Sequence, residues 1–144
     1  MKFLIINGPY LNMLGIREPE HYGTQTLADL EQMLQAEAER LGITIECFQS
    51  NHEGVLVDKI QSAYGTADGI LINPAAYTHT SVALLDAVKA VSLPTVEVHI
   101  SDPDTRDEFR KISYIRQACI GTVKGKGFAG YIEGLQMLVQ HLSN

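Results

Sequence analysis

Two clusters of hydrogen-bonding side chains, each containing a histidine, follow apolar segments of the sequence. Asn73–Ser81 follows the apolar run Gly69–Ile72, and Glu97–Ser101 follows Pro94–Val96. Hydrogen-bonding side chains at the carboxyl end of a parallel strand are where α/β proteins bind ligands. The two clusters are therefore predicted to form two walls of one pocket.

Within the second cluster, Glu97 and His99 are two residues apart, so on a strand their side chains lie on the same face. A carboxylate in that position can hold and orient an imidazole, which exchanges protons near neutral pH. The alternative for His99 is an ordinary hydrogen-bonded histidine at a strand end. The Glu-x-His-x-Ser pattern favours a role in chemistry.

The segment Gly8–Gln25 has no apolar periodicity. A segment of this length without regular structure in a compact domain is usually a lid or a binding loop. It contains Arg17, Glu18, His21 and Tyr22, so we predict a lid that carries reactive groups.

The rest of the sequence alternates between strand and helix patterns. Three of its short apolar runs are nearly continuous in Val, Ile and Leu, which is typical of strands buried on both faces. The alternation predicts an α/β fold of three layers, a flavodoxin-like five-stranded parallel sheet between helices, in a single domain over residues 1–144. The predicted strands are Phe3–Ile6, Ile43–Phe48, Gly69–Ile72, Thr95–Val98 and Ala118–Val123.

Four helices are predicted between and after these strands. The first begins at Thr26, with Asp29 in a capping-box position, and ends at Gly42 after a stripe of leucines. The other three are predicted at about Glu53–Tyr64, Ser81–Val91 and Phe128–Leu142.

The formal charge of −6 argues against nucleic acid or an anionic membrane as a partner. An anionic ligand would therefore need arginines gathered locally. Cys47 and Cys119 lie in apolar runs and are expected to be buried, reduced thiols, as in a cytosolic protein. The run Phe3–Ile6 is too short for a signal peptide or a membrane span, so we predict a cytoplasmic protein.

Other chemistries fit the sequence less well. A hydrolase triad of His79, Ser81 and Asp86 lacks a nucleophile elbow, and Ser81 is expected to cap the following helix. The histidines share no ligand spacing on one helix, so no metal site is predicted. A flavin- or nucleotide-binding domain is an alternative, although the loop after the first strand is poor in glycine.

With these residues identified, the chain resembles the type II 3-dehydroquinate dehydratases. The resemblance implies a lyase of the shikimate pathway that removes water from 3-dehydroquinate through an enolate, with no imine, metal or cofactor. It also implies a homo-oligomer, a dodecamer built from trimers. The resemblance runs from end to end and rests on the order and spacing of Asn7–Pro9, Leu11–Gly15, Arg17–Pro19, Tyr22–Gly23, Gln49–Gly54, Asn73–Pro74, Tyr77–Leu84, Asp86–Ala87, Glu97–Ser101, Arg106, Glu108–Arg110 and Ser113–Tyr114.

The resemblance further implies catalytic roles. Tyr22 is the expected base, and because a free phenol has a pKa near ~10, it needs a cation beside it at neutral pH. Arg17 is the expected activator, and Arg106 can add to its field. His99 is the expected general acid, oriented by Glu97.

Six residues are implied to bind the anionic substrate. Its carboxylate is expected on Ser101 and the backbone of Ile100, and Asp86 is expected to come from a neighbouring subunit. The alternative for Arg106 and Arg110 is ion pairing with the acidic residues beside them on one helix face, and both roles can coexist. The six residues are Asn73, His79, Asp86, Ile100, Ser101 and Arg110.

One residue departs from the family pattern inside the expected site. The family motif Asn-Gly-Pro-Asn, whose last asparagine helps hold a water that donates to the enolate oxygen, here reads Asn7–Tyr10 with tyrosine last. The Tyr10 hydroxyl can replace that water, or its ring can obstruct the pocket. The second outcome would leave a severely slowed or non-catalytic relative that binds the substrate. Ala75, where glycine is usual, and Asp102–Asp104 are smaller departures.

Overall fold

Parallel strands form one sheet in the computed structural model of the protein, which describes residues 1–16, 20 and 24–144. The order across the sheet is β2-β1-β3-β4-β5, and each neighbouring pair is parallel. The predicted five-stranded parallel sheet is therefore confirmed. The strands are β1 (Lys2–Asn7), β2 (Thr44–Gln49), β3 (Gly69–Asn73), β4 (Thr95–His99) and β5 (Gly121–Lys124).

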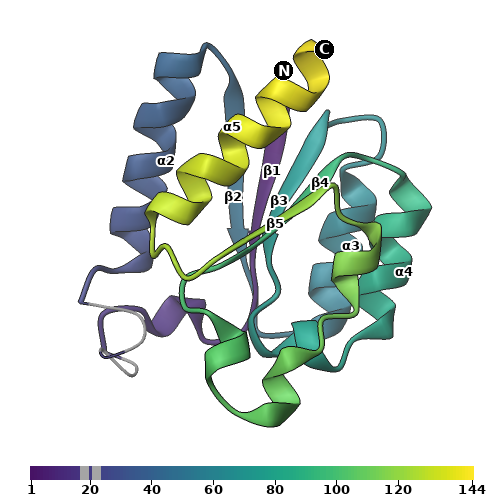
Figure 1. Cartoon of the computed structure of the whole chain (residues 1–144). Helices are drawn as coiled ribbons and strands as arrows, with labels where there is room; N and C mark the ends of the chain where they lie inside the picture. Colours follow the sequence, from purple (N-terminus) through teal and green to yellow (C-terminus); the bar gives the residue numbers. More distant parts are fainter. Residues whose placement is uncertain (17–19, 21–23) are drawn as a thin grey trace.

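Helices cover both faces of the sheet, which gives the three layers of a flavodoxin-like fold (Figure 1). Alternate residues of β1 enter two buried clusters, Phe3 and Ile5 on one face and Leu4 and Ile6 on the other. Because both faces are covered, the inner strands are apolar throughout. The first face carries α2 (Leu27–Leu41) and α5 (Ala129–Ser143), and the second carries α3 (Glu53–Ser62) and α4 (Val82–Val91).

Two helices begin at the capping residues that the sequence predicts. The Thr26 hydroxyl accepts a hydrogen bond from the Asp29 backbone N–H at 3.2 Å, and the Asp29 carboxylate accepts one from the Thr26 N–H at 2.9 Å. The Ser81 hydroxyl accepts from the Leu84 N–H at 2.9 Å and starts α4. α2 ends at Gly42, whose φ of 70° is in the left-handed region that glycine adopts readily.

The segment before β5 differs from the prediction. The sequence predicts a strand over Ala118–Val123, but Ile115–Ala118 forms the 3-10 helix η5, and β5 begins only after it. Ile115 is buried in the cluster shared with α3 and α4, so packing against helices fixes this segment in place of strand pairing. Cys119 therefore lies outside the sheet, and both it and Cys47 are half-buried free thiols, not fully buried ones.

Short 3-10 helices connect the elements at the carboxyl ends of the strands, at the lower edge of the sheet in Figure 1. The sequence predicts no regular structure over Gly8–Gln25, yet η1 lies there, and its first residue Leu11 and the following Leu14 are buried in the core. In the described part of the chain, no helix is both long and apolar enough to cross a membrane. The 3-10 helices at this edge are η1 (Leu11–Met13), η2 (Ala75–His79), η3 (Pro103–Thr105) and η4 (Glu108–Lys111).

Candidate active site

A pocket lies at the carboxyl ends of β1, β3 and β4, where the sequence predicts one. Its described walls come from the ends of these strands and from the 3-10 helices that follow them. The two polar clusters of the sequence thus face a single cavity. The predicted site residues that line it are Tyr10, Asn73, His79, His99, Ile100, Ser101, Arg106 and Arg110.

His99 lies in this pocket beside a fully buried carboxylate. Glu97 has no exposed surface, and the Nε2 nitrogen of His99 lies 2.5 Å from the Glu97 Oε2 oxygen. An ionised carboxylate only accepts hydrogen bonds, so Nε2 carries the proton in this pair. The other ring nitrogen, Nδ1, is therefore the one that can exchange a proton with a bound ligand.

Besides His99, four other side chains hold the Glu97 carboxylate in place. Its Oε2 oxygen accepts from the Ser113 hydroxyl at 2.9 Å and from the Thr78 hydroxyl at 3.2 Å. Its Oε1 oxygen accepts from the Thr122 hydroxyl at 3.3 Å. The Arg116 guanidinium donates to both oxygens, from Nε to Oε1 at 3.0 Å and from Nη2 to Oε2 at 3.2 Å. A buried charge needs this degree of compensation.

These contacts keep the Glu97 carboxylate ionised. Burial acts to raise the pKa of Glu97, but the hydrogen bonds and positive charges of His99 and Arg116 outweigh it and lower the pKa to about 2. Burial of a carboxylate alone favours its neutral form, whereas cationic partners favour the charged form. Glu97 therefore orients the His99 ring as an anion at neutral pH.

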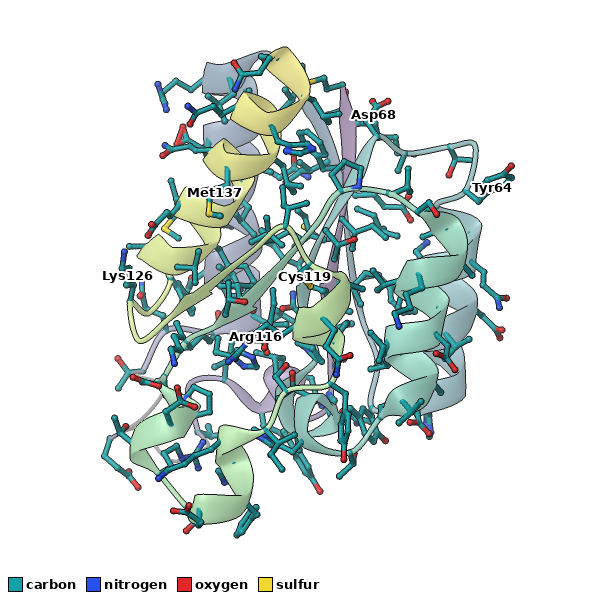
Figure 2. The ribbon with its side chains drawn as sticks, turned by 45° about the vertical axis from the view of Figure 1, so that its right-hand side comes forward. Tyr64, Asp68, Arg116, Cys119, Lys126 and Met137 are labelled. Carbon is teal, nitrogen blue, oxygen red and sulfur yellow. The ribbon has the colours of Figure 1, made fainter. Side chains whose placement is uncertain are left out.

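Arg116 is a site residue that the sequence analysis missed. It lies on η5, just before the strand predicted over Ala118–Val123, and Figure 2 shows it at the lower end of the sheet, below Cys119. A usable signal did exist: an acidic residue in a buried strand, such as Glu97, requires a cationic partner. The sequence does not say which cation supplies it.

His79 faces the pocket with a fixed tautomer. Its Nδ1 nitrogen lies 2.7 Å from the Ile112 carbonyl oxygen, which can only accept, so Nδ1 carries the proton. Burial lowers the pKa of His79, the bond to Ile112 opposes this, and the nearby charges of His99 and Arg110 lower it further. The neutral ring then has Nε2 available as an acceptor for a ligand hydroxyl.

Asn73 belongs to a buried hydrogen-bond chain under the pocket. Its amide nitrogen donates to the Tyr131 hydroxyl at 2.9 Å, and that hydroxyl donates to the Asn7 Oδ1 oxygen at 2.6 Å. The Asn73 side-chain oxygen accepts from the Ala75 N–H at 3.0 Å. Tyr131, from α5, is fully buried and was not singled out by the sequence. The chain ties the ends of β1 and β3 to α5 and so fixes one wall of the pocket.

Arg106 and Arg110 do not share one helix face, as the alternative for this pair assumes. Arg106 follows η3, Arg110 lies on η4, and both line the pocket. The Arg110 Nε donates to the Asp107 carboxylate at 3.0 Å, so its ion-pairing role and its place in the pocket do coexist. The departure at Asp102–Asp104 is also explained, because the Lys124 ammonium pairs with Asp104 and anchors η3 to β5.

Two departures from the family pattern have left-handed backbone conformations. Tyr10 has a φ of 68° and Ala75 a φ of 53°. For a residue with a side chain, this left-handed conformation costs roughly 1–2 kcal/mol relative to the right-handed helical one. Asparagine and glycine tolerate this conformation best. The Tyr10 N–H donates to the Asn51 side chain at 3.0 Å, which holds the turn, and its side chain remains 57% exposed at the pocket.

Besides the buried Glu97, which lies behind His99, three predicted site residues do not line the described pocket. Asp86 is exposed on α4 and does not line it, as expected for a residue implied to act on a neighbouring subunit. Tyr22 and Arg17 lie outside the described residues. Within residues 1–16, 20 and 24–144, no group of three His, Cys, Asp or Glu side chains could hold a metal ion.

The fold and the site together define a three-layer α/β protein with a buried glutamate–histidine pair beside a pocket at the carboxyl edge of its sheet. Residues 1–139 match the model of the dehydroquinase class II family, and the chain belongs to this family. It is 56% identical over 142 residues to a 3-dehydroquinate dehydratase of Geotalea daltonii, and the match covers 99% of each chain.

Solved structures agree with this membership. The type II dehydroquinase of Butyrivibrio crossotus is 49% identical and superposes with a TM-score of 0.95, over 96% of this chain and 97% of the other. The type II dehydroquinase of Propionibacterium acnes is 37% identical, with a TM-score of 0.93 over 96% of each chain. The predicted resemblance is confirmed.

Proposed function

We propose that this protein is a 3-dehydroquinate dehydratase, a lyase that converts 3-dehydroquinate to 3-dehydroshikimate in the shikimate pathway. The observation that carries the proposal is the buried Glu97–His99 pair, which opens into a pocket lined by Arg106 and Arg110 in a member of this family. The pair supplies a proton donor, and the arginines suit an anionic substrate.

The reaction needs a base and an acid. Tyr22, as phenolate beside Arg17, takes a proton from the carbon next to the ketone, and the electrons of that C–H bond form an enolate. The enolate then collapses to a carbon–carbon double bond conjugated with the ketone and expels the hydroxyl group, which His99 protonates as it leaves. Water leaves, Tyr22 releases its proton and His99 takes one up, so the net change is loss of water and no redox partner is required.

The geometry around His99 suits the role of acid. Its Nε2 is bonded to Glu97, so the proton for the leaving hydroxyl comes from Nδ1. The ionised Glu97 stabilises the imidazolium before transfer and fixes the ring for it. A hydroxide ion is a poor leaving group, and this proton transfer removes that difficulty.

The described pocket also suits the polar groups of the substrate. The Ser101 hydroxyl and the Ile100 backbone receive the carboxylate, near Asn73. The acceptor Nε2 of His79 and the guanidinium of Arg110 meet the ring hydroxyls. Asp86 completes the site from a neighbouring subunit, and segment 8–25, with Tyr22 and Arg17, acts as the lid of this single domain.

The first test compares the natural chain with its Tyr10→Asn variant. We expect both to form the conjugated product, followed by its ultraviolet absorbance, with rates within about tenfold of each other because the phenol can donate to the enolate oxygen in place of a water. The variant should fold at least as well, because asparagine tolerates the left-handed conformation at this position.

A second candidate function is binding of the substrate without turnover. It is favoured by one observation, the Tyr10 ring at the pocket. Activity that appears only in Tyr10→Asn, with a gain of about 10²–10³ in rate, would identify the natural chain as such a binder. Absence of activity in both folded proteins would contradict the dehydratase proposal.

We further propose that the protein acts in the cytoplasm as a homo-oligomer, a dodecamer built from trimers. The exposed position of Asp86, away from the pocket of its own chain, supports a shared site. Sedimentation equilibrium should give a mass about twelve times the 15.8 kDa of one chain. A monomeric mass with full activity would contradict the shared site.

A further inference from the structure

Arg116 is the strongest unassigned polar feature next to the pocket. Its guanidinium donates through two nitrogens to the two oxygens of Glu97, whereas it does not line the pocket itself. A fork of this kind fixes both the position and the orientation of a carboxylate. The hydrogen bonds that connect Arg116 to the described pocket therefore run through Glu97 to His99.

We infer that Arg116 is a positioning residue for the acid His99, because it neutralises and orients Glu97 so that His99 can release its proton to the leaving group. This inference rests on the proposed dehydratase function. The arrangement is a row of three groups, in which Arg116 and His99 compete for the same buried negative charge.

The competition determines the direction of the effect. Without the charge of Arg116, Glu97 would act on His99 alone and hold its imidazolium more firmly. His99 would then stay protonated to higher pH and give up its proton less readily. Removal of Arg116 should therefore slow proton transfer from His99. It should also move the alkaline limb of the profile of kcat against pH to higher pH.

Other charged groups near His99 stay in place in such a variant. Lys124 is the neighbour of His99 across the β4–β5 ladder, and its ammonium is already paired with Asp104 and lies 3.7 Å from Asp102. The further titratable or charged groups facing the described pocket are Tyr10, His79, Arg106 and Arg110. A shift of the alkaline limb of the pH profile in an Arg116 variant is therefore assigned to the Glu97–His99 pair.

The test uses Arg116→Gln and Arg116→Lys in the full-length protein, with Arg40→Gln as the matched control. Arg40 pairs with Glu37 on the exposed surface of α2, so its loss removes the same charge without touching the site. The kcat of Arg116→Gln should fall about tenfold with KM nearly unchanged, as for groups that orient a catalytic side chain. The alkaline limb of kcat against pH should move up by about one pH unit.

Arg116→Lys keeps the positive charge but loses the paired hydrogen bonds to the two Glu97 oxygens. The alkaline limb of its pH profile should therefore match that of the unchanged protein, while its kcat falls severalfold. Unchanged kcat and an unchanged limb in folded Arg116→Gln would overturn the inference and make Arg116 a structural residue only. If Arg116→Gln does not fold, the test rests on Arg116→Lys. A kcat of Arg116→Lys equal to that of the unchanged protein would then overturn the inference.

A second readout separates this inference from the dehydratase proposal. The titration of the His99 ring, followed by NMR in the absence of substrate, should have its midpoint at higher pH in Arg116→Gln than in the natural chain and Arg40→Gln. This measurement needs no turnover. An inactive natural chain would contradict the proposed function alone, whereas an unmoved His99 midpoint would contradict the role of Arg116 alone.

Discussion

A Tyr22→Phe variant is expected to lose nearly all turnover of 3-dehydroquinate while it still binds the substrate. The change removes only the hydroxyl that takes the proton, and loss of a general base costs about 10²–10⁴ in rate. The product is followed by its ultraviolet absorbance, and binding to the inactive variant is measured by calorimetry. Exchange of the substrate's acidic proton with D₂O should also stop, because no enolate forms.

Tyr64→Phe is the matched control. Tyr64 is 73% exposed at the turn after α3 and projects away from the body of the protein in Figure 2, so the same change there should leave kcat and KM unaltered. Loss of binding in Tyr22→Phe would show that Tyr22 recognises the substrate and is not the base. Retained turnover would require a different base.

A His99→Gln variant is expected to lose about 10²–10⁴ in kcat for a different reason. Its amide can still donate to Glu97, which keeps a donor at the buried carboxylate, but it cannot protonate a leaving hydroxyl. The first half of the reaction remains, because Tyr22 is intact. We therefore expect the substrate to exchange its acidic proton with D₂O while loss of water nearly stops.

His141→Gln serves as the control for His99→Gln. His141 is exposed near the end of α5, and its replacement should leave both exchange and dehydration unchanged. Exchange lost together with dehydration in His99→Gln would mean that His99 also takes part in enolate formation. Dehydration within tenfold of the natural rate would remove His99 from the role of acid.

The two variants together locate each proton transfer. Tyr22→Phe should block both exchange and dehydration, whereas His99→Gln should block dehydration alone. This difference also distinguishes an enzyme from a binder, because a protein that only binds 3-dehydroquinate would catalyse neither process.

Features decided by neighbouring residues could be predicted from the sequence. The start of α2 depends on Thr26 and Asp29, three residues apart, and both capping bonds are present. Continuous apolar runs predict the inner strands because the helices cover both faces of the sheet. The Glu97–His99 pair was predicted for a similar reason, since residues two apart on a strand share a face.

Features that join distant segments could not be predicted in this way. Arg116 meets Glu97 across 19 positions, and Tyr131 meets Asn7 across 124, and no local pattern marks either partner. The strand predicted over Ala118–Val123 begins only at Gly121, and packing against α4 makes Ile115–Ala118 the 3-10 helix that brings Arg116 to the carboxylate.

The sequence by itself thus determined the family, the sheet, the capped starts of two helices and the Glu97–His99 contact, because each of these depends on short-range spacing or on motifs in a fixed order. Only the tertiary structure decided which cation neutralises Glu97 and which hydroxyl supports Asn73. The physical reason is that a buried polar group must be satisfied, but any donor that the fold brings within reach can satisfy it.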